Sequence, residues 1–203
     1  MKIISVVQNT ERWFELRKGR ITGSKKVRPK RGTARLDGFY ELIADRLEMP
    51  KEDVSATQQG HDLEPEAIAH FEQEYNVKVD TDMMWVSDEN ENIAISPDGG
   101  IKIDGKYKEA VEVKCLAGKN YIRAVEEEMI PGDYSDQVLS YFVVNPDLEI
   151  LHFVFYDPYI KVKPMFVIDV YRTERFQDEI DNYREYQLEL LQDIDEIVEK
   201  WAF

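Results

Sequence analysis

Three charged residues on two neighbouring segments could form a site that cleaves phosphodiesters. Asp98 follows Pro97 at the end of a short apolar run, and Glu112 and Lys114 lie in the alternating segment 110–115. Side chains in a strand repeat every two residues, so Glu112 and Lys114 should share one face. An ordinary ion pair on an exposed strand is the alternative. The apolar character of 110–115 and the glycine-rich hairpin joining it to Asp98 favour the catalytic interpretation.

The residue types suit a hard divalent cation. Mg²⁺ prefers carboxylate oxygens and keeps several of its waters. A bound metal lowers the pKa of a water and neutralises a leaving oxygen, which phosphodiester hydrolysis requires. A lysine beside the metal could hold or polarise the attacking water. The pattern therefore predicts a Mg²⁺-dependent hydrolase, and it does not distinguish Mg²⁺ from Mn²⁺.

A second candidate site, for an anion, lies upstream. Thr10 or Asn9 can cap a short helix that ends near Gly19. The next residues resemble a loop that leads into another helix, whose free backbone N–H groups could bind phosphate. A solvated basic loop is the alternative on these residues alone. Thr22 or Ser24 could cap this second helix. The residues expected around a bound phosphate or DNA are therefore Arg17, Thr22, Ser24, Lys25 and Lys26.

Charge is distributed very unevenly along the chain. The net charge is −15, yet residues 1–35 contain 11 Lys or Arg and only 2 Glu, a net charge of +9. The remaining residues therefore carry −24. Such asymmetry indicates a segment that binds a polyanion, attached to an acidic body that repels nucleic acid elsewhere.

Length and composition limit the class of protein. The 203 residues suffice for one domain with a substantial core, so a single domain over 1–203 is expected. No apolar run approaches the ~20 residues of a membrane span, and no export signal is expected. A lone cysteine, Cys115, excludes an internal disulfide framework and any cysteine-cluster metal site, which fits a reducing cytoplasm.

Hydrophobic periodicity predicts an α/β fold with a central mixed sheet flanked by helices. A narrow apolar seam over 173–203 indicates one long, acidic C-terminal helix that packs across the body, with subunit association as the alternative. Glu64 should lie in the first turn of a helix over 63–75, beside Pro65. Helices are expected at 36–49, 119–129 and 133–144, and strands at 77–86, 93–96, 101–104, 110–115, 148–156 and 165–170.

Five short motifs together resemble the phage lambda exonuclease group, alkaline exonucleases of viral recombination with the PD-(D/E)xK nuclease fold. The resemblance covers most of the chain, and the motifs are specific only in combination. They are Trp13 to Ser24, Gly60 with Glu64 and Ala67, Ser96 to Gly99, Glu112 to Cys115, and Gln137 with Tyr141.

The resemblance implies roles for the acidic cluster. Asp98 and Glu112 would bind Mg²⁺, with the Val113 carbonyl as a further ligand. Glu64 would contribute at a second metal or through water. Lys114 would position and activate the attacking water.

Further roles follow from the same resemblance. Gln137 would orient the attacking water or Lys114. Arg17 and Ser24 would grip a 5′-terminal phosphate, giving end selectivity and a 5′→3′ direction.

The resemblance also implies a biological setting. The expected activity is degradation of one strand of duplex DNA from a 5′-phosphorylated end, releasing mononucleotides and leaving a 3′ single-stranded tail. A ring-shaped homotrimer, a single-strand annealing partner and the cytoplasm of a phage-carrying bacterium are implied as well. Two alternatives stay open: an endonuclease of the same fold in restriction or repair, and a non-catalytic DNA-binding module.

Overall fold

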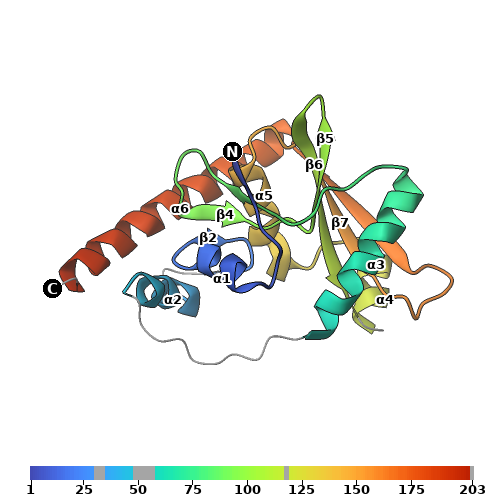
Figure 1. Ribbon diagram of the computed structural model, residues 1–203, viewed down its shortest axis with the longest axis horizontal. Helices are drawn as coiled ribbons and strands as arrows, with labels where there is room; N and C mark the ends of the chain where they lie inside the picture. The colour runs from blue at the N-terminus through green and yellow to red at the C-terminus, as the bar shows by residue number, and fades with distance from the viewer. Residues whose placement is uncertain (30–34, 48–57, 117–118, 202–203) are drawn as a thin grey trace.

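Two four-stranded sheets lie on either side of a buried helix, α5 (Ser135–Val144), as Figure 1 shows. The computed structural model describes residues 1–29, 35–47, 58–116 and 119–201. Part of the expected basic segment, residues 30–34, therefore lies outside the described residues. The α/β class, the flanking helices and the long C-terminal helix are confirmed. The strands, however, divide into two mixed sheets.

The first sheet has the order β1-β3-β4-β2, with strands β1 (Lys2–Ser5), β2 (Ile21–Thr22), β3 (Met83–Val86) and β4 (Ile93–Ile95). Strand β2 runs parallel to β4, and the other pairs are antiparallel. The strand expected over 77–86 is shorter than predicted. Asp82 has a positive φ of 57°, a left-handed conformation that interrupts an extended strand.

The expectation of a helix beginning at Thr22 or Ser24 is wrong. Residues 21–22 are extended because they pair with Ile93 and Ala94 of β4. The next described helix is α2 (Asp37–Arg46). The short helix before β2 is confirmed as α1 (Glu11–Arg17), and the Thr10 hydroxyl accepts a hydrogen bond from the Trp13 amide.

The second sheet has the order β5-β6-β7-β8, formed by β5 (Gly99–Ile103), β6 (Lys106–Cys115), β7 (Ile150–Tyr156) and β8 (Met165–Tyr171). Strands β6 and β7 are parallel, and β5 and β8 pair antiparallel at the two edges. The hairpin between β5 and β6 turns at Asp104 and Gly105, which both have positive φ. Two such residues match the twist of a tight hairpin.

Side chains of β6 alternate between the two faces of this sheet. Val111 and Val113 pack toward helix α3 (Gln58–Tyr75), whereas Ala110 belongs to the core that contains α5. Helix α3 begins upstream of the expected start, so Pro65 lies inside it. Glu64 is therefore outside the first turn, and its expected position at the start of the helix is wrong.

Helix α5 is enclosed over its C-terminal two turns, which are mostly apolar. Residues 138–144 are all buried, and they contact both sheets and the C-terminal helix α6 (Glu174–Trp201). The seam of α6 is buried against α5 and α2 at Ile180, Tyr183, Gln187, Leu190 and Ile194. This confirms that α6 packs across the body. Its last described residue, Trp201, is 71% exposed. No helix within the described ranges has the length and apolarity to cross a membrane.

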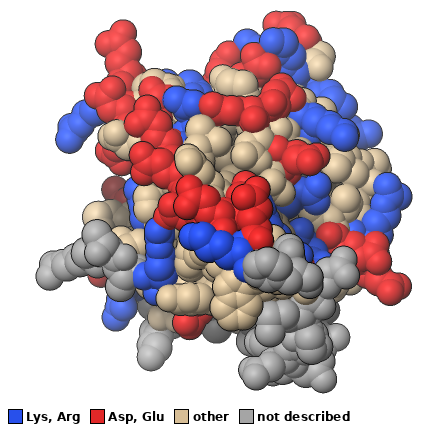
Figure 2. All heavy atoms as spheres, turned by 90° about the vertical axis from the view of Figure 1, so that its left-hand side faces the viewer, with Lys and Arg blue, Asp and Glu red and all other residues tan. Residues whose placement is uncertain are grey.

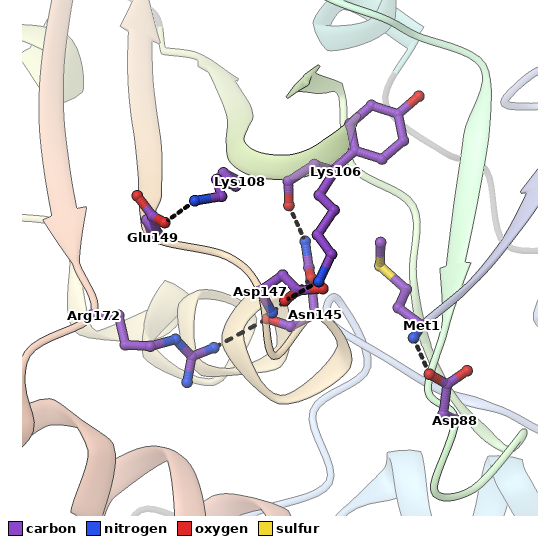
Figure 3. Close-up of polar contacts among 9 residues, drawn as sticks. Met1, Asp88, Lys106, Lys108, Asn145, Asp147, Glu149 and Arg172 are labelled. Atoms are coloured by element: carbon purple, nitrogen blue, oxygen red, sulfur yellow. Dashed lines mark hydrogen bonds and ion pairs between the residues drawn. The ribbon is translucent and has the colours of Figure 1, made fainter. Parts of the chain in front are cut away.

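Arg172, just after β8, ties the end of α5 to its surroundings (Figure 3). Its guanidinium donates to the carbonyls of Phe142 at 2.8 Å, Asn145 at 3.0 Å and Leu148 at 2.9 Å. Asn145 in turn donates to the carbonyl of Tyr107, at the start of β6, at 2.7 Å. These bonds satisfy orphan carbonyls at a helix C-terminus.

Two ion pairs join the same regions at the surface. Lys106 lies 2.9 Å from Asp147, and Lys108 lies 2.6 Å from Glu149 (Figure 3). Helix α5 and strand β6 are thus held together at one end. Consequently, the residues that they carry further along face each other in a defined register.

Candidate active site

One cavity collects most of the residues that the sequence singles out. It has a volume of about 320 Å³ and lies where α1, α3, α5 and β6 approach one another. Its wall also includes Gln8, Trp13 and Tyr134, which sequence reasoning did not assign to it. The expected site residues in the wall are Arg17, Ser24, Glu64, Asp98, Glu112, Val113, Lys114 and Gln137.

Asp98 is held at the corner between β4 and β5. Its Oδ2 accepts a hydrogen bond from the Val113 backbone N–H at 2.8 Å, and Gln8 donates to its Oδ1 at 3.4 Å. The following residue must be glycine, because a Cβ at Gly99 would lie 2.1 Å from the Val79 Cγ1. Glycine at this position lets the start of β5 pack closely against Val79.

Glu112 is the most enclosed charge of the site, at 2% exposure. Its Oε1 accepts from Lys114 Nζ at 2.5 Å and from Gln137 Nε2 at 2.6 Å. Its Oε2 accepts from the Tyr141 hydroxyl at 2.5 Å. The two-residue spacing on β6 brings Lys114 to Glu112, and the four-residue spacing on α5 aims Gln137 and Tyr141 at it together. A buried carboxylate is tolerated because these donors compensate its lost hydration.

Burial, and after it the neighbouring carboxylates, shift the pKa values of the site. Burial, followed by the charges of Glu112 and Glu64, raises the pKa of Asp98 well above its usual value. Burial works against the charged form of Lys114, but Glu112 and Asp98 outweigh it and raise the Lys114 pKa. Burial and Glu112 also raise the pKa of Tyr141, so its hydroxyl remains a hydrogen-bond donor.

These carboxylates fit a divalent cation by their chemistry. A cation between them would relieve the repulsion that raises the pKa of Asp98. Tyr141 uses only one lone-pair site of Glu112 Oε2, so that oxygen can still accept a metal. In the part of the chain that the structure describes, no three acidic, histidine or cysteine side chains form a metal cluster by themselves. Mg²⁺ commonly takes one or two carboxylates and completes its shell with water, so a two-carboxylate site suffices.

Arg17 also lines the cavity. Its Nη2 donates to the Ser24 hydroxyl at 2.6 Å and to the Thr22 hydroxyl at 3.0 Å. The guanidinium also stacks on the Trp13 ring, 4.2 Å from its centroid. Burial lowers the Arg17 pKa to about 10, so the side chain stays charged at neutral pH. The Trp13 indole donates to the Ser96 hydroxyl at 3.0 Å, which connects Arg17 to the Asp98 corner.

The remaining expected DNA-binding residues differ from one another in position. Thr22 is only 2% exposed and serves to hold Arg17. Lys25 and Lys26 lie outside the cavity, in an adjoining groove of about 840 Å³. Lys25 pairs with Asp45 at 3.2 Å, whereas Lys26 is exposed. A helix N-terminus does not contribute to this anion site, because β2 takes its place.

Two of the unassigned wall residues had weak signals in the sequence, and one had none. Trp13 lies within the motif around Arg17, and Tyr134 precedes the helix that carries Gln137. Gln8 comes from the N-terminal segment, 90 positions from Asp98, and no local pattern relates the two. Cys115 is half-buried, packs against the cluster that contains α3, and lines the cavity.

Comparison with solved structures defines the class of fold. An alkaline exonuclease from Laribacter hongkongensis has 26% sequence identity and a TM-score of 0.79, with 95% of this chain and 98% of that chain covered. The same enzyme in complex with dAMP matches at 25% identity and a TM-score of 0.79 over the same shares. A phage-related exonuclease from Haemophilus somnus 129PT has 16% identity and a TM-score of 0.59, covering 90% and 96%. The chain thus has the fold of the alkaline exonucleases.

The family follows from the sequence itself. Residues 12–145 match the model of the YqaJ-like viral recombinase domain. The chain belongs to this family, and the resemblance to the lambda exonuclease group is confirmed. A search of curated proteins finds no match.

Proposed function

We propose that this protein is a Mg²⁺-dependent 5′→3′ exonuclease that degrades one strand of duplex DNA from a 5′-phosphorylated end. The observation that carries the proposal is one cavity lined both by an acidic, lysine-containing cluster and by Arg17 with Ser24. The similarity to structures described as alkaline exonucleases supports the nuclease activity.

The acidic cluster supplies the hydrolytic half of the site. Asp98 and Glu112 would hold Mg²⁺, with the Val113 carbonyl as a further ligand and Glu64 at a second metal or through water. When bound, the metal lowers the pKa of the attacking water and neutralises the leaving 3′-oxygen. Mn²⁺ is an alternative ion of suitable chemistry.

The chain's own residues would orient the reaction. Lys114, kept cationic by Glu112, would donate a hydrogen bond to the attacking water and to the phosphate. Gln137 and Tyr141 would hold Glu112 in one orientation, because each donates to a different oxygen. Preorganised groups of this kind lower the reorganisation that the reaction requires.

Arg17 and Ser24 would select the end that is cut. The Ser24 hydroxyl accepts from Arg17, so its own hydrogen remains available for a phosphate oxygen. Arg17 would form charge-assisted hydrogen bonds to the same phosphate. A 5′-phosphate held there would put the first nucleotide in the cavity, with the next phosphate at Lys114. The relative crystallised with dAMP binds the class of product that this arrangement would release.

The inferred biological role is recombination of the phage type. The product would be a duplex with a 3′ single-stranded tail, passed to a single-strand annealing protein in the cytoplasm of a bacterial host. A ring-shaped homotrimer around DNA is part of this proposal. The viral recombinase family of the chain supports the role in recombination.

Three substrates test the proposal in one assay with Mg²⁺. They are a linear duplex with 5′-phosphates, the same duplex with 5′-hydroxyls, and a covalently closed circle. We expect mononucleotides and a 3′ tail from the first, slow degradation of the second and no cleavage of the third. Cleavage of the closed circle would identify an endonuclease instead.

A variant separates catalysis from binding. Lys114→Ala should abolish cleavage of the phosphorylated duplex while binding to it is retained, as measured by fluorescence anisotropy. Near wild-type cleavage by this variant would remove Lys114 from the mechanism. Absence of nucleotide release by the wild-type protein, with DNA binding intact, would favour a non-catalytic DNA-binding module.

A further inference from the structure

Tyr134 lies where three hollows of the described surface meet. It lines the acidic cavity of about 320 Å³ and the basic groove of about 840 Å³. It also lines a third hollow of about 360 Å³ beside helix α4 (Lys119–Glu127), whose wall includes Arg123 and Met129. No other residue belongs to the walls of all three of these hollows.

The ring is held firmly at this junction. Tyr134 ends the short 3₁₀ helix Gly132–Tyr134, and its backbone N–H donates to the Pro131 carbonyl at 2.9 Å. The ring packs against Phe153 with centroids 5.6 Å apart. Lys114 Nζ lies 5.0 Å from the ring centroid. An aromatic ring thus stands directly beside the lysine of the acidic cluster.

The surroundings match the alternating chemistry of a DNA strand. The groove offers the exposed Lys26 to a phosphate, whereas Lys25 and Arg28 are paired with Asp45 and Asp136, and the cavity offers Lys114. Between them, Tyr134 is half-buried and offers an apolar ring. Bases of single strands stack on such rings, and this contact tolerates any sequence because every base has a π-face.

We propose that Tyr134 is a substrate-binding residue that supports the base of a nucleotide flanking the phosphodiester under attack. The strand would cross the ring where the cavity joins the groove. By stacking on the base, Tyr134 would position the attached phosphate near Lys114. Its effect on the reaction would come from this contact with the base and not from its contact with the lysine. This inference rests on the proposed nuclease function and adds a contact with the base to it.

Removing the ring and removing the base tests whether the two interact. Tyr134→Ala and Tyr134→Phe would be assayed on three 5′-phosphorylated duplexes: an intact one, one abasic at the first nucleotide, and one abasic at the second. On the intact duplex, we expect Tyr134→Ala to raise KM or lower kcat/KM about tenfold, in line with the stacking energy of one base. Tyr134→Phe should remain near wild type, since the ring is kept.

The abasic duplexes decide between the base and the lysine as the partner of the ring. On one of the two abasic duplexes, Tyr134→Ala should cleave as fast as the wild-type protein, because that duplex lacks the base on which the ring would stack. An equal loss on all three duplexes would overturn the proposal and assign the ring to Lys114 alone. No loss on the intact duplex would also overturn it.

Matched controls keep the outcome independent of folding and of the proposed function. Tyr159→Ala removes an 87% exposed tyrosine outside the three hollows and should leave all rates unchanged. Thermal unfolding checks that the Tyr134 variants fold. Failure of the wild-type protein to release nucleotides from the intact duplex would overturn the nuclease proposal itself, whereas failure of the abasic comparison alone would overturn only the role of Tyr134.

Discussion

At the scale of single residues, Glu112 and Arg17 each make several of the polar contacts in the site. Glu112 accepts hydrogen bonds from a lysine, an amide and a phenol, and these come from two different elements. Arg17 is stacked on Trp13 and directed by two hydroxyls. Both charges are partly dehydrated, so each is sensitive to the loss of any one partner.

Arg17 carries a prediction about end selectivity. Arg17→Ala should reduce cleavage of 5′-phosphorylated ends by at least tenfold and leave the slower cleavage of 5′-hydroxyl ends nearly unchanged, because only the former supplies the charge that Arg17 binds. Because burial lowers the Arg17 pKa to about 10, the wild-type preference for phosphorylated ends should decline as pH rises through that value. Initial rates on both substrates between pH 7 and pH 10.5 would measure this.

A second arginine on the same helix provides the control. Arg12 is exposed on α1 and does not line the cavity. Arg12→Ala should keep the wild-type ratio of the two rates. An equal fall of both rates in Arg17→Ala would instead assign Arg17 a purely structural role.

At the scale of elements, helix α5 determines the geometry of the acidic cluster. It is enclosed by both sheets and α6, and it presents Gln137 and Tyr141 to β6. Its C-terminal carbonyls are satisfied by Arg172, which lies just beyond β8. A displacement of α5 would therefore move two of the three hydrogen-bond donors to Glu112.

Arg172→Ala should destabilise the fold. The carbonyls of Phe142, Asn145 and Leu148 would lose a charged donor, and we expect a loss of about 1–3 kcal/mol in the free energy of unfolding. Urea denaturation monitored by circular dichroism measures this quantity. For comparison, Arg123→Ala removes an exposed residue whose i,i+4 contact to Glu127 is 3.9 Å long, and it should be nearly neutral. Equal stability of the two variants would show that Arg172 does not hold α5.

At the scale of the whole molecule, the basic segment is less available than its charge suggests. Lys25 pairs with Asp45, and Arg28 pairs with Asp136. Arg35 likewise reaches Asp193 on α6. Figure 2, which looks at the face with the free end of α6, shows Lys and Arg side chains interspersed with acidic ones. Ion pairs within the chain thus neutralise part of the positive charge of the basic segment.

A salt titration tests which charges remain for DNA. Lys26 is exposed in the groove, so Lys26→Ala should reduce the slope of log K against log salt by about 1, the contribution of one phosphate contact. Lys161→Ala, an exposed lysine in the β7–β8 loop outside the three hollows, should leave the slope unchanged. Both slopes come from anisotropy titrations of one duplex at several salt concentrations. Unchanged slopes in both variants would exclude Lys26 from the DNA path.

Local patterns were sufficient for much of the fold and for half of the candidate site. Two-residue spacing put Lys114 beside Glu112, and four-residue spacing put Gln137 in line with Tyr141. The seam of α6 was predicted from its spacing in the same way. These features depend on the backbone repeat of one element, which the residue types report directly.

Other features depended on contacts between distant segments. Residues 21–22 form a strand because they pair with β4, although the capping residues had suggested a helix there. The Ser24 hydroxyl therefore caps no helix and instead accepts a hydrogen bond from Arg17. The meeting of Gln8 with Asp98 has no local signal, because each side of the contact is specified by a different element. The sequence by itself determined which chemical groups the protein carries and along which faces they lie. Only the tertiary structure decided that the acidic cluster and Arg17 share one cavity, because burial and chain pairing act between residues far apart in the chain.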